Sequence, residues 1–198
     1  MDFAANLASQ SVKDLSAAAV DLRAEGVNGS IHLPALLENI QRIDSTKELD
    51  RFEEALLGYG AMTMGDIVGQ VGFDFDLPLH CSVLNCILAL TEAANIKVSV
   101  HAIYGLGNLR TNHANLITPL SRLVVSDLRN DENENVTLRA IALRILKRLD
   151  PAAAQEFFDT PAYREYIHAV EHWLETDAST NEDTRKELKL ELQWQNEN

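Results

Sequence analysis

The sequence predicts a mainly α-helical protein, and three observations support that prediction. Over most of the 198 residues, apolar side chains recur at the three- and four-residue spacing of a helix face. Capping residues, glycines and prolines divide these stretches into segments of ordinary helix length. The two-residue period that is typical of strands occurs in only two short segments. We therefore expect helices to form the core, with at most a small β element.

Three helices are expected before residue 60, at 3–24, 34–44 and 47–57. Gly26 ends the first of them, Pro34 suits the first turn of the second, and Ser45 or Thr46 can cap the third. Five of the nine glycines then fall within residues 58–72. Because glycine disfavours helix interiors, this stretch is expected to be an irregular connector and a domain boundary.

The middle of the chain is more regular and contains a repeat. Helices are expected at 79–93, 96–109, 115–129 and 135–149. Residues 98–103 match residues 136–141 at an offset of 38, and Leu84, Ile87 and Leu88 match Leu120, Leu123 and Val124 at an offset of 36. A repeated helix pair with a two-residue insertion in one loop explains both offsets.

The segment 136–151, which reads Val-Thr-Leu-Arg-Ala-Ile-Ala-Leu-Arg-Ile-Leu-Lys-Arg-Leu-Asp-Pro, resembles the second helix of a HEAT or armadillo-type repeat. The resemblance covers residues 79–150, with 151–175 as a degenerate third pair. The earlier copy departs from the pattern at His101, where arginine is favoured. The resemblance implies helix pairs stacked into a curved array. A right-handed helical bundle of irregular arrangement is the alternative.

Two segments alternate with the period of a half-buried strand. Val71, Phe73, Phe75 and Leu77 alternate with small or acidic residues, and Leu188, Leu190, Leu192 and Trp194 alternate with polar ones. Segments 71–77 and 188–194 are therefore expected to form a small two-stranded β element. For residues 184–194, a frayed acidic helix is the alternative interpretation.

The charge is distributed unevenly along the chain. The predicted organisation has N-terminal helices at 1–60, a glycine-rich connector at 61–78, a helical-repeat core at 79–175 and an acidic segment at 176–198. Residues 1–78 carry 13 acidic and 5 basic residues, residues 79–150 carry 6 and 8, and residues 151–198 carry 11 and 4. The acidity therefore belongs to the two flanks, around a slightly basic middle.

The overall net charge of −13 argues against nucleic acid or an anionic membrane as a nonspecific partner, since both attract surplus Lys and Arg. No signal peptide and no apolar stretch long enough to span a membrane are recognised. Cys81 and Cys86 lie in an apolar run and are expected to be buried and unreactive. A reducing, cytoplasmic location is expected.

No pattern of catalytic or metal-binding residues stands out. His168 and His172 share a helix face with four-residue spacing, but Glu171 is misplaced for the zinc-protease pattern and no third ligand is near. We therefore expect neither a metal nor a cofactor, and no enzymatic activity. A DNA-repair glycosylase-like enzyme that uses the basic helix Arg139–Arg148 is the least favoured alternative.

Binding of a basic protein is the expected function. In general character the chain is similar to bacterial immunity proteins, which are small, acidic and bind a toxin. The resemblance implies a protein that neutralises a basic toxin or effector, and an adaptor that binds a peptide or helix is the alternative. The candidate partner-binding residues are the exposed acids of one loop and of one flank, Asp127, Asp131, Glu132, Glu134, Asp74 and Asp76.

Overall fold

The structure is a computed structural model, and it describes residues 7–9, 11–126, 131–158, 160–176, 185–186 and 189. Most of these residues lie in helices. In chain order they are α2 (Val12–Glu25), the 3₁₀ helix η1 (Gly26–His32), α3 (Leu33–Gln41), α4 (Arg51–Val71), α5 (Pro78–Leu90), α6 (Ile96–Asn108), α7 (Ala114–Val125), α8 (Glu132–Leu149), α9 (Pro151–Phe158) and α10 (Pro161–Thr176). The prediction of a mainly α-helical protein is confirmed. The chain divides into two compact units, Met1–Leu120 and Ser121–Asn198.

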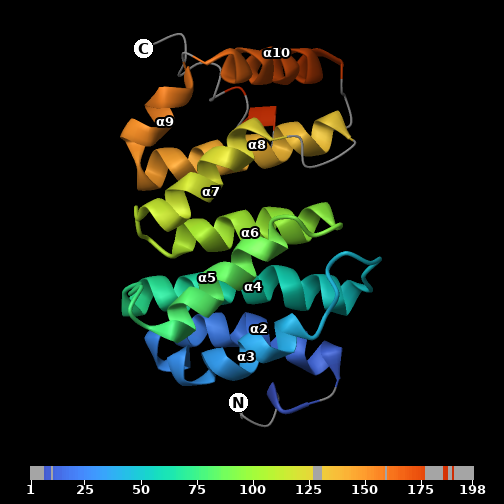
Figure 1. Cartoon of the computed structure of the whole chain (residues 1–198). Coiled ribbons are helices and arrows are strands. Elements are labelled where there is room, and N and C mark those ends of the chain that lie inside the picture. Colours follow the sequence, from blue (N-terminus) through green and yellow to red (C-terminus); the bar gives the residue numbers. More distant parts are fainter. Residues whose placement is uncertain are drawn as a thin grey trace. The chain divides into compact units, whose positions relative to one another are not determined.

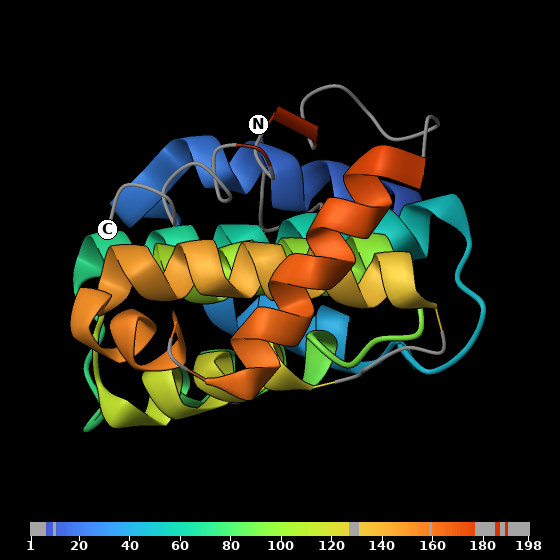
Figure 2. The same ribbon diagram turned by 90° about the horizontal axis from the view of Figure 1, so that it is seen from above.

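The first unit is built around α4. Helices α2 and α6 pack against opposite sides of α4 in one layer, and α3 and α5 contact each other and cover α4 in a second layer (Figures 1 and 2). The interior consists of aliphatic side chains, with Leu22, Leu36, Leu57, Ile67 and Ile87 fully buried between the layers. Side chains at helical spacing thus supply the core that the sequence pattern predicts.

Helix α4 corrects the prediction of an irregular glycine-rich connector at 61–78. A single helix continues to Val71, so the third expected helix is longer than residues 47–57. It begins with a capping box, in which Asp50 accepts from the backbone of Glu53 and the side chain of Glu53 accepts from the backbone of Asp50. Four of the five glycines of residues 58–72 lie inside the helix, where its neighbours approach so closely that larger side chains would not fit.

The closest approach is between α4 and α6. A Cβ atom added at Gly65 would overlap the carbonyl oxygen of Gly105, and one added at Gly69 would overlap the carbonyl oxygen of Asn108. On the other side of α4, a Cβ atom at Gly60 would lie 2.5 Å from Cδ1 of Ile40. Packing between helices therefore offsets the low helix propensity of these glycines.

Residues 71–77 do not form the predicted strand. Val71 ends α4, Gly72 has a φ of 98°, and the residues that follow form a loop. The ring of Phe73 lies 4.6 Å from that of Phe75, and Phe75 lies 3.9 Å from the ring of His113. Alternate residues thus enter one aromatic cluster rather than one face of a sheet. Of the second predicted strand, 188–194, only Lys189 is described.

The second unit contains α8, α9 and α10, which contact one another. Leu143 and Leu146 of α8 are buried, as are Tyr163, Tyr166 and Val170 of α10. Residues 151–175, expected to be a degenerate helix pair, do form two helices.

Candidate functional site

The predicted acidic binding residues belong to different units. Asp74 and Asp76 lie in the loop between α4 and α5 of the first unit, and both are exposed. Asp131, Glu132 and Glu134 lie at the start of α8 in the second unit. Asp127 and the side chain of Glu132 lie outside the described residues.

Several of these acids have structural roles. Asp131 caps α8, where its Oδ1 accepts a hydrogen bond of 3.0 Å from the backbone of Glu134, and Glu134 is half-buried. Asp74 Oδ1 accepts from the backbone of Asp76 at 2.8 Å. Of the predicted residues whose side chains are described, Asp76 therefore offers the least engaged carboxylate. Capping of turns and helices explains part of the acidic pattern.

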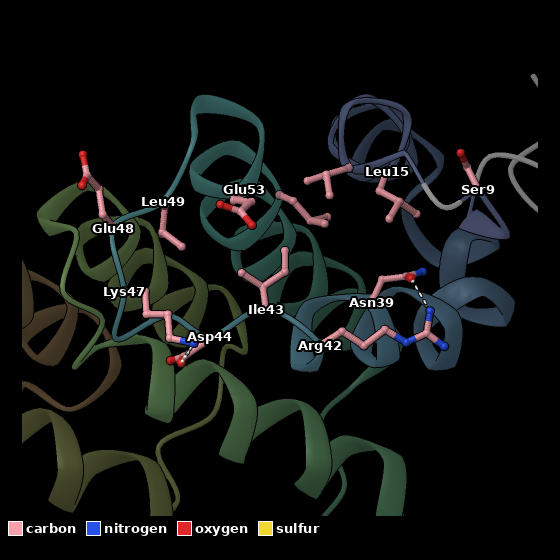
Figure 3. A pocket seen from close by; sticks show the side chains of 12 residues that line it. Ser9, Leu15, Asn39, Arg42, Ile43, Asp44, Lys47, Glu48, Leu49 and Glu53 are labelled. Atoms are coloured by element: carbon pink, nitrogen blue, oxygen red, sulfur yellow. Dashed lines mark hydrogen bonds and ion pairs between the residues drawn. The ribbon is translucent and has the colours of Figure 1, made fainter.

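The first unit also contains a cleft that the sequence interpretation missed. This cleft, here called the α2–α3–α4 cleft, has a volume of about 580 Å³. Val12, Ile43 and Leu49 form half-buried apolar walls, and Leu15 and Leu56 are buried below them. Figure 3 shows the walls and the charged rim, which comprises Arg42, Asp44, Lys47, Glu48 and Glu53. The cleft combines an apolar interior with a charged rim, as binding sites commonly do.

The basic groups of the rim are already paired. Lys47 Nζ lies 2.9 Å from Asp44 Oδ2, and Arg42 Nη2 lies 2.5 Å from Oε1 of Glu38 just outside the rim. Hydrogen bonds from Thr46, and then from Lys47, lower the pKa of Asp44 from 3.8 to about 2.

The acidic groups of the rim are not all paired. Glu53 accepts a bond of 2.9 Å from the backbone of Asp50, which occupies one of its oxygens. Glu48 is exposed, and within the described part of the chain its carboxylate has no hydrogen-bond or ion-pair partner. The rim therefore has a surplus of negative charge.

Asn39 fixes one end of the cleft. Its Nδ2 donates to the carbonyl oxygens of Leu7 and Ala35 at 2.9 Å each, and its Oδ1 accepts from Arg42 at 3.2 Å (Figure 3). The side chain is buried, so these bonds satisfy groups that would otherwise be costly to desolvate. Asn39 thus joins the N-terminal residues to α3 and leaves no amide proton for a ligand.

Local patterns do not reveal this cleft, because its walls come from elements that are separate in the sequence. Val12 starts α2, while Ile43 and Leu49 lie in the loop between α3 and α4. We expected residues 47–57 to form a helix, which would have placed Lys47, Glu48 and Leu49 on a helix surface. The one signal was Asp50 followed three residues later by Glu53, which marks the true helix start.

His101 is a second unusual group in the first unit. Its imidazole, on α6, is half-buried against Gly58 of α4, and the Tyr59 ring lies 5.1 Å away. Nδ1 is buried and has no hydrogen-bond partner among the described residues. Burial lowers the pKa of His101, as do Arg23 of α2 and Lys97 of α6 to a smaller extent, whereas Glu54 of α4 opposes the decrease.

We expect acid to destabilise the first unit through His101. The pKa of His101 is lowered on folding, so the unfolded chain binds the proton first, and stability falls as the pH drops below 6.5 toward the folded-state pKa. His101→Gln should flatten this dependence when the free energy of unfolding is measured from pH 8 to pH 5. His172→Gln, at an exposed site on α10, is the control and should leave the dependence unchanged. An equal acid sensitivity in His101→Gln would contradict the prediction.

The histidine pair on α10 and the two cysteines have ordinary environments. His168 is exposed and its Nδ1 lies 3.4 Å from Oε2 of Glu171. Among the described residues, no three His, Cys, Asp or Glu side chains are grouped to hold a metal ion. Burial raises the pKa of the Cys86 thiol to about 11, and Cys81 is half-buried, with its Sγ 3.3 Å from the carbonyl oxygen of Phe75. Cys86 is therefore buried as expected, whereas Cys81 is only half-buried.

Helices of the length and apolarity needed to cross a bilayer do not occur in the described part of the chain. Comparisons with protein-family models, curated proteins and solved structures gave no match. The described part of the chain is all-helical.

Proposed function

We propose that this protein is a binding module that captures a basic protein partner and neutralises it, as an immunity protein does with a toxin. The observation that carries this proposal is the excess of acidic over basic residues in the first unit, 14 against 7 over residues 1–120. The proposal assigns the protein a binding role rather than a catalytic one.

Four of the seven basic side chains of this unit pair with carboxylates. Arg23 pairs with Asp66, Arg42 with Glu38, Lys47 with Asp44 and Lys97 with Glu54. Among the described residues of this first unit, four exposed carboxylates have no hydrogen-bond or ion-pair partner, those of Glu25, Glu48, Asp76 and Glu92. The negative charge left over is therefore available to a partner.

Such a surplus favours a partner rich in Lys and Arg. Opposite net charges speed the encounter of two proteins and repel acidic competitors. An inhibitor of a toxin benefits from this speed, because it must bind before the toxin acts. The same argument holds for the acids at the start of α8, although Asp131 also caps that helix.

The proposal includes a HEAT-like arrangement of helix pairs. The offsets of 36 and 38 between matching residues support α5–α6 and α7–α8 as two copies of one repeat. Stacked pairs of this kind present extended surfaces to other proteins. An adaptor that binds a peptide or helix remains the second candidate, and the apolar walls of the α2–α3–α4 cleft favour it.

The test is to measure binding to the purified products of the neighbouring open reading frames. We expect one product with a surplus of Lys and Arg to bind, with an association rate that decreases as salt increases. The triple variant Glu25→Lys/Asp76→Lys/Glu92→Lys should slow association about tenfold. Its control, Glu25→Asp/Asp76→Glu/Glu92→Asp, keeps the charge and should keep the rate.

Each outcome separates the candidates. Binding that abolishes the partner's toxic activity supports neutralisation, whereas binding that leaves the activity intact supports an adaptor. If no product binds, or if the charge-reversed variant associates at the original rate, the proposal is wrong.

A further inference from the structure

We infer that the α2–α3–α4 cleft receives a peptide segment of the partner in which an aliphatic side chain lies beside a lysine or arginine. This inference rests on the proposed function, since it names where and by what chemistry a basic partner would dock. Three features of the cleft support it, namely its size, its apolar walls and the state of its charged groups.

The size fits a few side chains rather than a whole domain. A volume of about 580 Å³ falls within the range of about 300–1,000 Å³ that is typical of pockets for small ligands. Val12 of α2 is half-buried in this cleft, as are Ile43 and Leu49 of the loop between α3 and α4. An aliphatic side chain placed between them would remove apolar surface from water on both partners, which is favourable.

The polar and charged groups of the cleft determine which charge the bound peptide segment should carry. Asn39 already uses both amide protons and its carbonyl oxygen, so it offers no further donor. Arg42 and Lys47 are paired with Glu38 and Asp44. An acidic ligand would find only cations that already have a carboxylate partner.

A basic ligand faces no such restriction. Glu48 is exposed and unpaired within the described residues, and Glu53 has one oxygen beyond its bond to the Asp50 backbone. In Figure 3 the carboxylate of Glu53 lies beside the apolar space that Ile43 and Leu49 border. A lysine or arginine next to the buried aliphatic side chain would reach these carboxylates, and charge-assisted bonds of this kind are among the stronger polar contacts.

The experiment uses three short peptides as probes in an amide NMR titration of the whole protein. The first is acetyl-Lys-Leu-Leu-Lys-amide, which carries both features. Acetyl-Glu-Leu-Leu-Glu-amide reverses the charge, and acetyl-Lys-Gly-Gly-Lys-amide lacks the aliphatic side chains. We expect saturable shifts of the residues lining the cleft with the first peptide and none with the other two.

Two variants assign the effect to the cleft. Leu49→Ser and Glu48→Lys should each weaken binding of the first peptide about tenfold, which corresponds to about 1.4 kcal/mol. Glu25→Lys is the matched control, because it reverses an equally exposed carboxylate at the far end of α2, about 20 Å from Val12 along the helix. It should leave peptide binding unchanged, and the dispersion of the amide spectrum reports whether each variant is folded.

Failure of the inference is distinguishable from failure of the proposed function. Equal shifts with all three peptides, shifts away from the cleft, or unchanged affinity in Leu49→Ser and Glu48→Lys would overturn the inference. A basic partner can still bind the unsubstituted protein and associate more slowly with the Glu25→Lys/Asp76→Lys/Glu92→Lys variant. In that case the proposed function holds, but the cleft is not the docking site. If no partner binds while the peptide titration succeeds, the proposed function is wrong. The cleft is then still a site for a peptide with an aliphatic side chain beside a lysine or arginine.

Discussion

Gly65→Ala is expected to lower the free energy of unfolding of the first unit by about 2 kcal/mol. In an exposed helix the same change would stabilise by about 1 kcal/mol, because alanine has the higher helix propensity. At Gly65, however, the new methyl group would overlap the carbonyl oxygen of Gly105. A backbone carbonyl in a packed helix cannot rotate away, so α4 and α6 would have to separate. Urea unfolding followed by circular dichroism measures the change.

Gly60→Ala is the matched control for this prediction. Gly60 lies in the same helix and gains the same helix propensity, but the three atoms nearest to its added Cβ are all side-chain atoms, with Cδ1 of Ile40 the nearest at 2.5 Å. That methyl group ends a side chain that can adjust its rotamer, so we expect a much smaller loss than at Gly65. Equal stability of Gly65→Ala and the unsubstituted protein would show that α4 and α6 are not in this close contact.

Arg23→Ala is expected to lower the free energy of unfolding by about 2 kcal/mol, because it leaves the Asp66 carboxylate without its guanidinium partner. The side chain of Asp66, in the middle of α4, is only 13% exposed, whereas that of Arg23 on α2 is 41% exposed. Removing the arginine therefore leaves a largely desolvated charge unpaired, which is more costly than losing a surface ion pair.

Lys47→Ala provides the comparison with a surface pair. Lys47 and Asp44 have side chains that are 74% and 47% exposed, so we expect a change of no more than about 0.5 kcal/mol. The double variant Arg23→Ala/Asp66→Ala should be more stable than the sum of the single changes predicts, since neither charge is then left alone. Arg23→Ala and Lys47→Ala with the same stability would contradict a special role for the Arg23–Asp66 pair.

The helices of this protein are predictable because their signals are local. Asn95 caps α6 by accepting from the backbone of Lys97 and Val98, and the predicted helix at 96–109 matches Ile96–Asn108. The helix predicted at 79–93 likewise corresponds to Pro78–Leu90. In both cases apolar spacing and a terminal residue lie within one segment of chain, so no distant contact is needed to recognise them.

The predictions were wrong where a local sequence pattern was caused by contacts with residues far away in the chain. The glycines of residues 58–72 were interpreted as loop formers, but all of them except Gly72 lie inside α4 and face neighbouring elements, as Gly65 does with Gly105. The alternation at 71–77 was interpreted as a strand, but Phe73 and Phe75 gather in one aromatic cluster with His80 and His113. Of the candidate site, the acidic surplus was predictable from composition, whereas the apolar cleft beside it was not.

Sequence alone determined the helical class, most helix positions and the excess of acid, because each depends on residue type and on spacing within one segment. Tertiary structure decided which acids are neutralised and which remain free, since Asp66 meets Arg23 across 43 positions of the chain while Glu48 meets no base within the described residues. It also decided that Val12, Ile43 and Leu49 face one space. Contacts between residues far apart in the chain depend on how helices pack, and packing follows from the shapes of all the side chains together.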